Sequence, residues 1–128
     1  MGRRNPFFRR IEGRMIAAAR HSFRMAATDT AGKAFAARME QAAKAGIIPK
    51  PKPGPRMPRQ AQHVWEWFLE LNAARTGNGF GPNPITFQEL KAWADLTGRN
   101  PKPMEVHWLK ALDRLWMTEN ATKRESDG

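Results

Sequence analysis

The sequence contains no cysteine, and its acidic residues are scarce in one half. The absence of cysteine excludes disulfides and thiolate chemistry and leaves the redox compartment undetermined. No apolar run approaches the roughly 20 residues that a membrane-spanning helix needs. No β-branched segment alternates with a period of two, so a sheet is not expected. These absences leave an all-α chain without a membrane span as the predicted class.

The formal charge of +10 belongs to the first half of the chain. Residues 1–59 carry 14 Lys and Arg against 3 Asp and Glu, a net of +11. Residues 60–128 carry 8 against 9, a net of −1. This asymmetry predicts a near-neutral domain with a basic arm. Arg14, Arg20 and Arg24 interrupt the N-terminal segment, so a secretory signal is not expected and the cytosol is the default location.

Two Ala-rich helices are predicted in the first half. An apolar stripe recurs at spacings of three and four in the segment from Pro6 to about Ala27. Thr28–Thr30 offers N-cap residues for a second helix, which carries Phe35 and Met39 and stops at Gly46. Both stripes are thin, so residues 1–46 are expected to form a basic helical arm or hairpin that is either marginally stable alone or ordered only against a partner. Residues 47–58 hold five prolines and predict an extended linker.

Three helices are predicted in the second half, as a compact domain over residues 59–118. "VWEWFLEL", residues 64–71, fits a helix better than a strand, because a strand would place Glu66 and Glu70 on its apolar face. Thr86 and Glu89 form a capping box at the start of the next helix, which Gly98 closes. The last helix runs from Met104 to about Met117. Residues 119–128 are expected to be a polar disordered tail.

The glycine-rich stretch "ARTGNGFGPNPITFQEL", residues 74–90, raises the question of a phosphate-binding loop. It matches neither the P-loop nor the dinucleotide-binding pattern, and its helix N-cap is occupied by Thr86. The three histidines lie far apart, and no nucleophile or acid–base constellation accompanies them. The sequence therefore predicts no enzyme, no catalytic residue, no cofactor and no metal site.

The basic arm leaves several alternatives open. Its arginines could neutralise nucleic-acid phosphates, meet an acidic protein, form a solubilising face, or lie with nearby apolar side chains on a membrane surface. No helix-turn-helix, zinc-finger or RNA-recognition signature accompanies them. The candidate residues for an anionic partner are Arg3, Arg4, Arg9, Arg10, Arg14, Arg20 and Arg24.

Residues 64–116 resemble small tail assembly chaperones of long-tailed bacteriophages and prophages. The resemblance begins with a W-x-x-F-x-x-L helix, here Trp65, Phe68 and Leu71, and continues with Arg75. A G-x-x-P-I-[ST] connector and an E-L-x-A-W-x-x-L-T-G helix follow, here Gly81, Pro84, Ile85, Thr86, Glu89, Leu90, Ala92, Trp93, Leu96, Thr97 and Gly98. The last helix contributes Glu105, Leu112 and Asp113. The family often has an aromatic residue before that Glu, where this chain has Met104.

The resemblance implies a non-enzymatic protein of the host cytoplasm that binds tape-measure or tail-tube protein during tail assembly. The residues expected to serve core and contact are Trp65, Trp67, Arg75, Phe80, Pro84, Trp108 and Trp116. Trp67 lies away from Val64 and Phe68 on the predicted helix and is expected to be partly exposed. The alternative function is a phage nucleic-acid-associated protein that binds through the basic arm. The sequence leaves the oligomeric state open.

Overall fold

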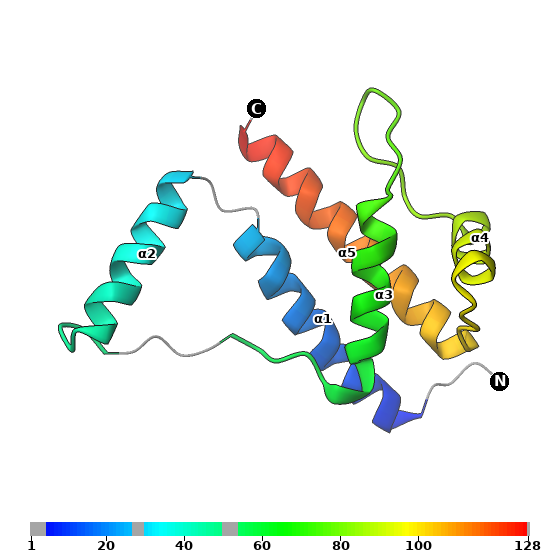
Figure 1. Ribbon diagram of the computed structural model, residues 1–128, viewed down its shortest axis with the longest axis horizontal. Coiled ribbons are helices and arrows are strands. Elements are labelled where there is room, and N and C mark those ends of the chain that lie inside the picture. The colour runs from blue at the N-terminus through cyan, green and yellow to red at the C-terminus, as the bar shows by residue number, and fades with distance from the viewer. Residues whose placement is uncertain (1–4, 27–29, 50–53, 128) are drawn as a thin grey trace.

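The computed structural model describes residues 5–26, 30–49 and 54–127, and these form an all-α fold (Figure 1). The all-α prediction is confirmed, since no strand occurs among these residues and the only pairing of that kind is one isolated bridge, Gly77 to Pro82. No helix in the described ranges is long and apolar enough to cross a membrane. The elements are α1 (Pro6–Ala26), α2 (Thr30–Lys44), η1 (Arg59–Ala61), α3 (Gln62–Ala73), α4 (Phe87–Thr97) and α5 (Pro103–Asp127).

The helices α1 and α5 lie side by side and run in the same direction (Figure 1). Near their first turns the rings of Phe8 and Trp108 meet edge to face at 6.4 Å. Near the other end the Arg24 guanidinium donates to Glu119 at 3.2 Å. The helix α3 packs against α5 as well. The core is therefore built where α1, α3 and α5 meet.

The core draws its residues from both sides of the proline-rich segment. The helix α1 contributes Ile11, Met15 and Ala19, each at most 3% exposed. The other members are Ala61, Val64, Phe68, Leu71, Ile85, Leu90, Trp108, Leu109 and Leu112. This differs from the expectation of a core confined to residues 59–118 with a basic arm outside it. The reason is that the apolar stripe of α1 adds buried apolar area, which a unit as small as residues 59–118 has difficulty providing alone.

The proline-rich segment also ends against this core. Pro58 is buried and Met57 packs on the core cluster. The Gly54 backbone lies so close to α1 that a Cβ on it would come within 2.3 Å of the His21 ring. A side chain at residue 54 would therefore require the His21 ring to move.

The segment between α3 and α5 must reverse the chain. His63 near the start of α3 bonds Glu105 near the start of α5, and Arg75 just after α3 reaches Asp113 further along α5. The two helices therefore run in the same direction, and a short turn cannot join them. Residues 74–86 and α4 together carry the chain back to the start of α5 (Figure 1).

Several predicted helix ends are confirmed. The Thr86 hydroxyl accepts from the Glu89 N–H at 3.1 Å, and the Glu89 carboxylate accepts from the Thr86 N–H, which completes the capping box. Gly98 ends α4 with a φ of 71°. After α2, Gly46 has a φ of 78°, as the predicted stop requires. Of the predicted N-cap candidates Thr28–Thr30, residues 28 and 29 lie outside the described residues, and Thr30 is the first residue of α2.

The last helix is longer than predicted. It begins at Pro103, where the Lys102 N–H donates to the Glu105 carboxylate at 2.7 Å, and continues to Asp127. A polar disordered tail was expected from residue 119. No glycine or proline occurs between Pro103 and Gly128 to stop the helix, and Glu119 forms ion pairs with Arg20 and Arg24 of α1.

The helix α2 stands apart from this bundle at the left of Figure 1. It makes no substantial contact with another element within the described part of the chain. Every side chain from Lys33 to Gln41 is exposed, and only Ala42 and Ala43 are half-buried. The two Ala-rich helices are thus placed differently: α1 lies in the core and α2 does not.

Two methionines of α1 test whether this helix belongs to the core. Met15 is fully buried, whereas Met25 is 55% exposed. We expect Met15→Ala to lower the free energy of unfolding by about 2–5 kcal/mol, because it leaves a cavity in the core. The control Met25→Ala should change it by less than about 0.5 kcal/mol. Urea denaturation measures both, and equal effects would show that α1 lies outside the cooperative core.

Candidate binding surface

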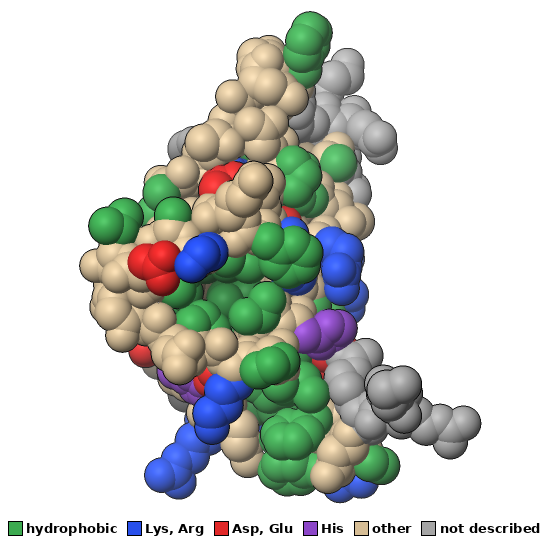
Figure 2. Space-filling model, turned by 90° about the vertical axis from the view of Figure 1, so that its right-hand side faces the viewer, with side chains coloured by type: hydrophobic (Ala, Val, Ile, Leu, Met, Phe, Trp, Pro, Cys, Tyr) green, Lys and Arg blue, Asp and Glu red, His purple; other side chains and the backbone are tan. Residues whose placement is uncertain are grey.

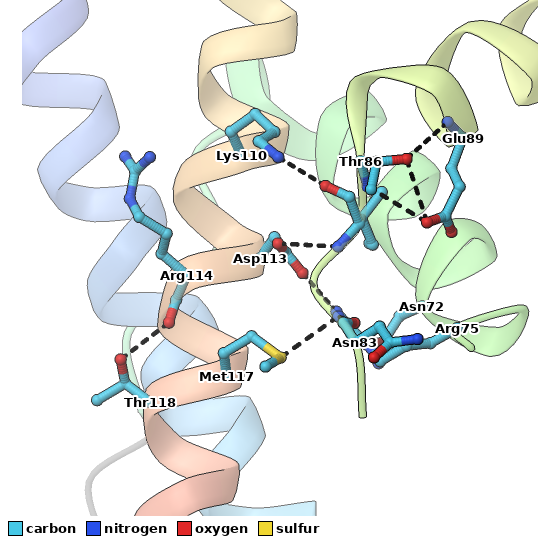
Figure 3. Close-up of polar contacts among 11 residues, drawn as sticks. Asn72, Arg75, Asn83, Thr86, Glu89, Lys110, Asp113, Arg114, Met117 and Thr118 are labelled. Atoms are coloured by element: carbon cyan, nitrogen blue, oxygen red, sulfur yellow. Dashed lines mark hydrogen bonds and ion pairs between the residues drawn. The ribbon is translucent and has the colours of Figure 1, made fainter. Parts of the chain in front are cut away.

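A buried ion pair joins the end of α3 to the middle of α5 (Figure 3). The Arg75 guanidinium lies 2.7 Å from the Asp113 carboxylate, and the two side chains are 5% and 3% exposed. Removing two charges from water is costly, and such a pair is tolerated only when further hydrogen bonds satisfy both groups. The surroundings of both side chains therefore decide whether the pair can hold the fold together.

The Arg75 side chain is satisfied on several sides. Its Nε donates to the Asn72 side chain and one Nη donates to the Asn83 carbonyl, each at 2.7 Å. The same Nη lies 3.5 Å from the Met117 sulfur. The guanidinium carbon lies 4.0 Å from the ring centroid of Trp116, a cation–π contact. One side chain thus connects α3, the following loop and α5.

The Asp113 carboxylate and its neighbour Lys110 hold the far end of that loop. The second Asp113 oxygen accepts from the Ile85 N–H at 3.2 Å. The Lys110 ammonium donates to the Ile85 carbonyl at 2.6 Å. Both backbone groups of Ile85 are therefore bound to α5, one residue before the Thr86 cap. The loop from residue 74 to residue 86 is fixed at both ends, and we call it the anchored loop.

The tip of the anchored loop is held by its own short-range bonds. The Asn78 side chain accepts from the N–H groups of Phe80 and Gly81 at 2.9 and 3.1 Å. The Asn83 N–H donates to the Thr76 carbonyl at 2.8 Å. Gly79 has a φ of 87°, which glycine adopts without strain. The loop's N–H groups at Phe80 and Gly81 are thus bound internally, and Phe80 projects 87% exposed.

Two further exposed apolar side chains follow this tip in the sequence, up to the first residue of α4. Pro84 is exposed and Phe87 is 66% exposed, with the Lys110 ammonium 4.7 Å from its ring centroid. Figure 2 shows apolar side chains gathered on the face of the molecule that corresponds to the right-hand side of Figure 1. We call Phe80, Pro84 and Phe87 the loop surface. Phe87 was not among the predicted contact residues, because the sequence pattern places it with Leu90 on the apolar stripe of this helix.

The predicted tryptophans occupy three different environments. Trp108 is 3% exposed and belongs to the core. Trp116 is half-buried under the Arg75 guanidinium. Trp65 and Trp67 are also half-buried and pack against the core. The structure therefore does not gather these four side chains into one exposed patch.

Trp65 and Trp67 point to different neighbours. Trp65 is stacked on Phe68 with ring centroids 6.1 Å apart and also contacts Phe23 of α1. Trp67 meets Trp93 of α4 edge to face at 5.6 Å. One residue therefore helps to hold α1 on α3, and the other helps to hold α4 on α3.

The basic residues of α1 divide into two groups. Arg9, Arg10 and Arg14 are exposed near its start. Arg20 and Arg24 lie 3.6 and 3.2 Å from the Glu119 carboxylate of α5. Arg3 and Arg4 lie outside the described residues. The positive charge of α1 is thus partly balanced by α5, and the part near its N-terminus faces solvent.

A second polar contact joins α3 and α5 at their starts. Burial would raise the pKa of the Glu105 carboxyl, but hydrogen bonds from the Lys102 N–H and from His63, and the charges of both residues, lower it. The ionised form is therefore favoured where it caps α5.

Among the described residues, no three His, Cys, Asp or Glu side chains cluster as a metal site would need.

The role of Asp113 could have been found from the sequence. It follows Leu112 and lies four residues after Leu109, so it shares the buried stripe of α5. An acidic residue on an apolar stripe indicates a buried partner. Which basic residue that partner would be cannot be read from spacing, because Arg75 is 38 positions away in the sequence.

In a comparison with known protein families, a family model described as phage tail assembly chaperone matches residues 38–118. The match spans more than half of the chain, including part of α2, all of α3 and α4, and the anchored loop. The chain belongs to this family of phage tail assembly chaperones. Searches of curated proteins and of solved structures gave no significant match.

Two aspartates test the contribution of the buried pair. We expect Asp113→Ala to lower the free energy of unfolding by about 3–5 kcal/mol, because it leaves the Arg75 charge buried without its partner. The matched control is Asp95→Ala, which removes an exposed pair with Lys91 at 3.3 Å and should cost less than about 0.5 kcal/mol. Urea denaturation compares the two. Similar small losses would mean that the buried pair does not hold the fold.

Proposed function

We propose that this protein is a non-enzymatic chaperone that binds the tape-measure or tail-tube protein while a phage tail is assembled. The match of residues 38–118 to the phage tail assembly chaperone family carries this proposal. A chaperone of this kind keeps the apolar surface of an unassembled partner covered until assembly. It therefore needs an apolar surface of its own that water already reaches.

The loop surface meets that requirement. Phe80 and Phe87 are 87% and 66% exposed, and Pro84 lies between them in the sequence. Large aromatic side chains supply much of the binding energy in protein interfaces. The Arg75–Asp113 pair and the Ile85 contacts fix the loop before binding, which lowers the conformational entropy lost on association.

Co-expression with the tape-measure and tail-tube proteins of the same phage tests this proposal. We expect the soluble fraction of one of them to rise with the wild-type chain. Phe80→Ala combined with Phe87→Ala should weaken the purified complex by at least about tenfold, since two aromatic anchors are lost. Leu96→Ala is the matched control, because Leu96 is 88% exposed and lies on the opposite side of α4 from Phe87. Titration calorimetry measures the affinities.

The same titration separates this function from nucleic-acid binding by the basic residues. Binding through apolar contacts should persist between 50 and 200 mM salt, whereas a contact with several phosphates would lose about a thousandfold or more. Deleting residues 1–46 is unsuitable, because it removes Ile11, Met15 and Ala19 from the core. Charge reversal at the exposed Arg9, Arg10 and Arg14 is the appropriate variant. Tight, salt-sensitive binding to DNA or RNA that this variant loses, without binding to either tail protein, would contradict the proposal.

A further inference from the structure

The side of α1 that faces away from the core is strongly basic. Ile11, Met15 and Ala19 mark the core side of this helix. The positions on the opposite side recur at spacings of three and four, and all of them are exposed except the half-buried Ala17. They are Arg9, Arg10, Gly13, Arg14, Ala17, Arg20, His21 and Arg24. We call the five arginines among them the arginine face of α1.

The acidic side chains around α1 leave this face positive. Glu12, the one acidic residue of α1, lies 3.0 Å from His107 of α5. Glu119 of α5 pairs with Arg20 and Arg24, whose side chains nevertheless remain 44% and 65% exposed. Within the described part of the chain, no carboxylate pairs with the first three arginines of the face. The face therefore attracts a partner that carries several negative charges.

The composition of the arginine face distinguishes between classes of anionic partner. A helix that binds a membrane surface inserts its apolar side into the lipid, and the apolar side of α1 is occupied by the core. A protein interface depends on large apolar side chains near its centre. Between its first and last arginines this face offers only Gly13, Ala17 and His21 besides the guanidinium groups, and the exposed Phe7 lies beyond its end.

The phosphate backbone of a nucleic acid matches the arginine face. The face extends over residues 9–24, which is about 22 Å at about 1.5 Å per residue. A duplex places one phosphate per strand about every 3.4 Å along its axis, so several phosphates lie within that length. A guanidinium group binds phosphate through two N–H groups and also stacks on bases. The 52% exposed ring of Phe7, three residues before Arg10 on the same side, can stack as well.

We propose that the arginine face of α1 binds the backbone of a nucleic-acid strand without preference for its sequence. The core holds α1 in place, so the arginines are positioned before binding. The affinity is that of a non-specific contact, about 1–100 µM at physiological salt. Glu119 lowers it, because this carboxylate competes with phosphate for Arg20 and Arg24. The contact uses no residue of the loop surface, so it does not depend on the proposed function and can accompany it.

Neutral substitutions on α1 test the location of the site. The probe is a fluorescein-labelled DNA strand of about 20 nucleotides, followed by fluorescence anisotropy between about 50 and 200 mM salt. We expect the triple variant Arg9→Gln, Arg10→Gln and Arg14→Gln to make the slope of log K against log salt concentration less steep by about 2, because three phosphate contacts are lost. A second strand of different sequence should bind within about threefold of the first.

A matched control removes the same charge from α2. The triple variant Lys33→Gln, Arg38→Gln and Lys44→Gln changes three exposed side chains and should alter the slope by less than about 1. Thermal melting by circular dichroism checks that both triple variants keep the bundle, which these exposed positions do not support.

Removal of the competing carboxylate tests the same face by a gain of affinity. Glu119→Gln should strengthen binding of the strand about two- to fivefold, since phosphate no longer displaces a carboxylate from Arg20 and Arg24. The control Asp95→Asn makes the same change of net charge on α4, which has no substantial contact with α1, and also breaks an exposed pair with a cation. It should change the affinity by less than about 1.5-fold.

Competing polyanions separate a nucleic acid from the other anionic partners. Poly-L-glutamate and phosphatidylserine vesicles carry charge but no bases, so at equal charge concentration they should displace the strand at least about tenfold less effectively. Displacement as effective as that by unlabelled strand would assign the face to an acidic protein or a membrane and overturn the proposal. No binding of the strand at about 100 µM protein and 50 mM salt, equal losses for the two triple variants, or no gain from Glu119→Gln would overturn it too.

Discussion

The ion pair between Arg75 and Asp113 is the contact on which the arrangement of this molecule depends. It lies at the end of α3, where the chain must leave one helix and return to the start of another that runs the same way. Burying a charged pair costs desolvation free energy. The pair is stable here because Asn72, Asn83 and Ile85 form hydrogen bonds with the donors and acceptors that the pair itself does not use. The same contacts fix the anchored loop, so both the packing of α3 on α5 and the position of the proposed binding surface depend on this ion pair.

The position of α1 shows that the basic half of the chain is not a separate arm throughout, because α1 packs in the core. Its apolar stripe is part of the core, and its arginines lie on the solvent side, with Glu119 balancing Arg20 and Arg24. The positive charge is therefore carried in part by a helix that the fold needs. The helix α2 differs from α1, because it makes no substantial contact with another element within the described part of the chain.

The features predicted correctly from the sequence are those that depend on neighbouring residues. The Thr86–Glu89 capping box and the stops at Gly46 and Gly98 each involve residues a few positions apart, so the signal is complete within one segment. The pairing of α1 with α5 and of Arg75 with Asp113 joins distant segments, and a single sequence carries no record of such contacts. The extension of α5 was missed in part for the same reason, since Glu119 gains its partners from α1, although the absence of glycine and proline after Pro103 was visible in the sequence.

The amide hydrogen of Ile85 gives the most direct measure of the central claim, that the buried pair fixes the anchored loop. This N–H donates to Asp113 and lies outside any helix. If the claim holds, its hydrogen exchange, followed by NMR, should be about as slow as that of the Leu109 and Leu112 amides in the core, because all three would open only when the bundle unfolds. Exchange of Ile85 at the rate of an unprotected loop, while the amides of α5 remain protected, would contradict the account.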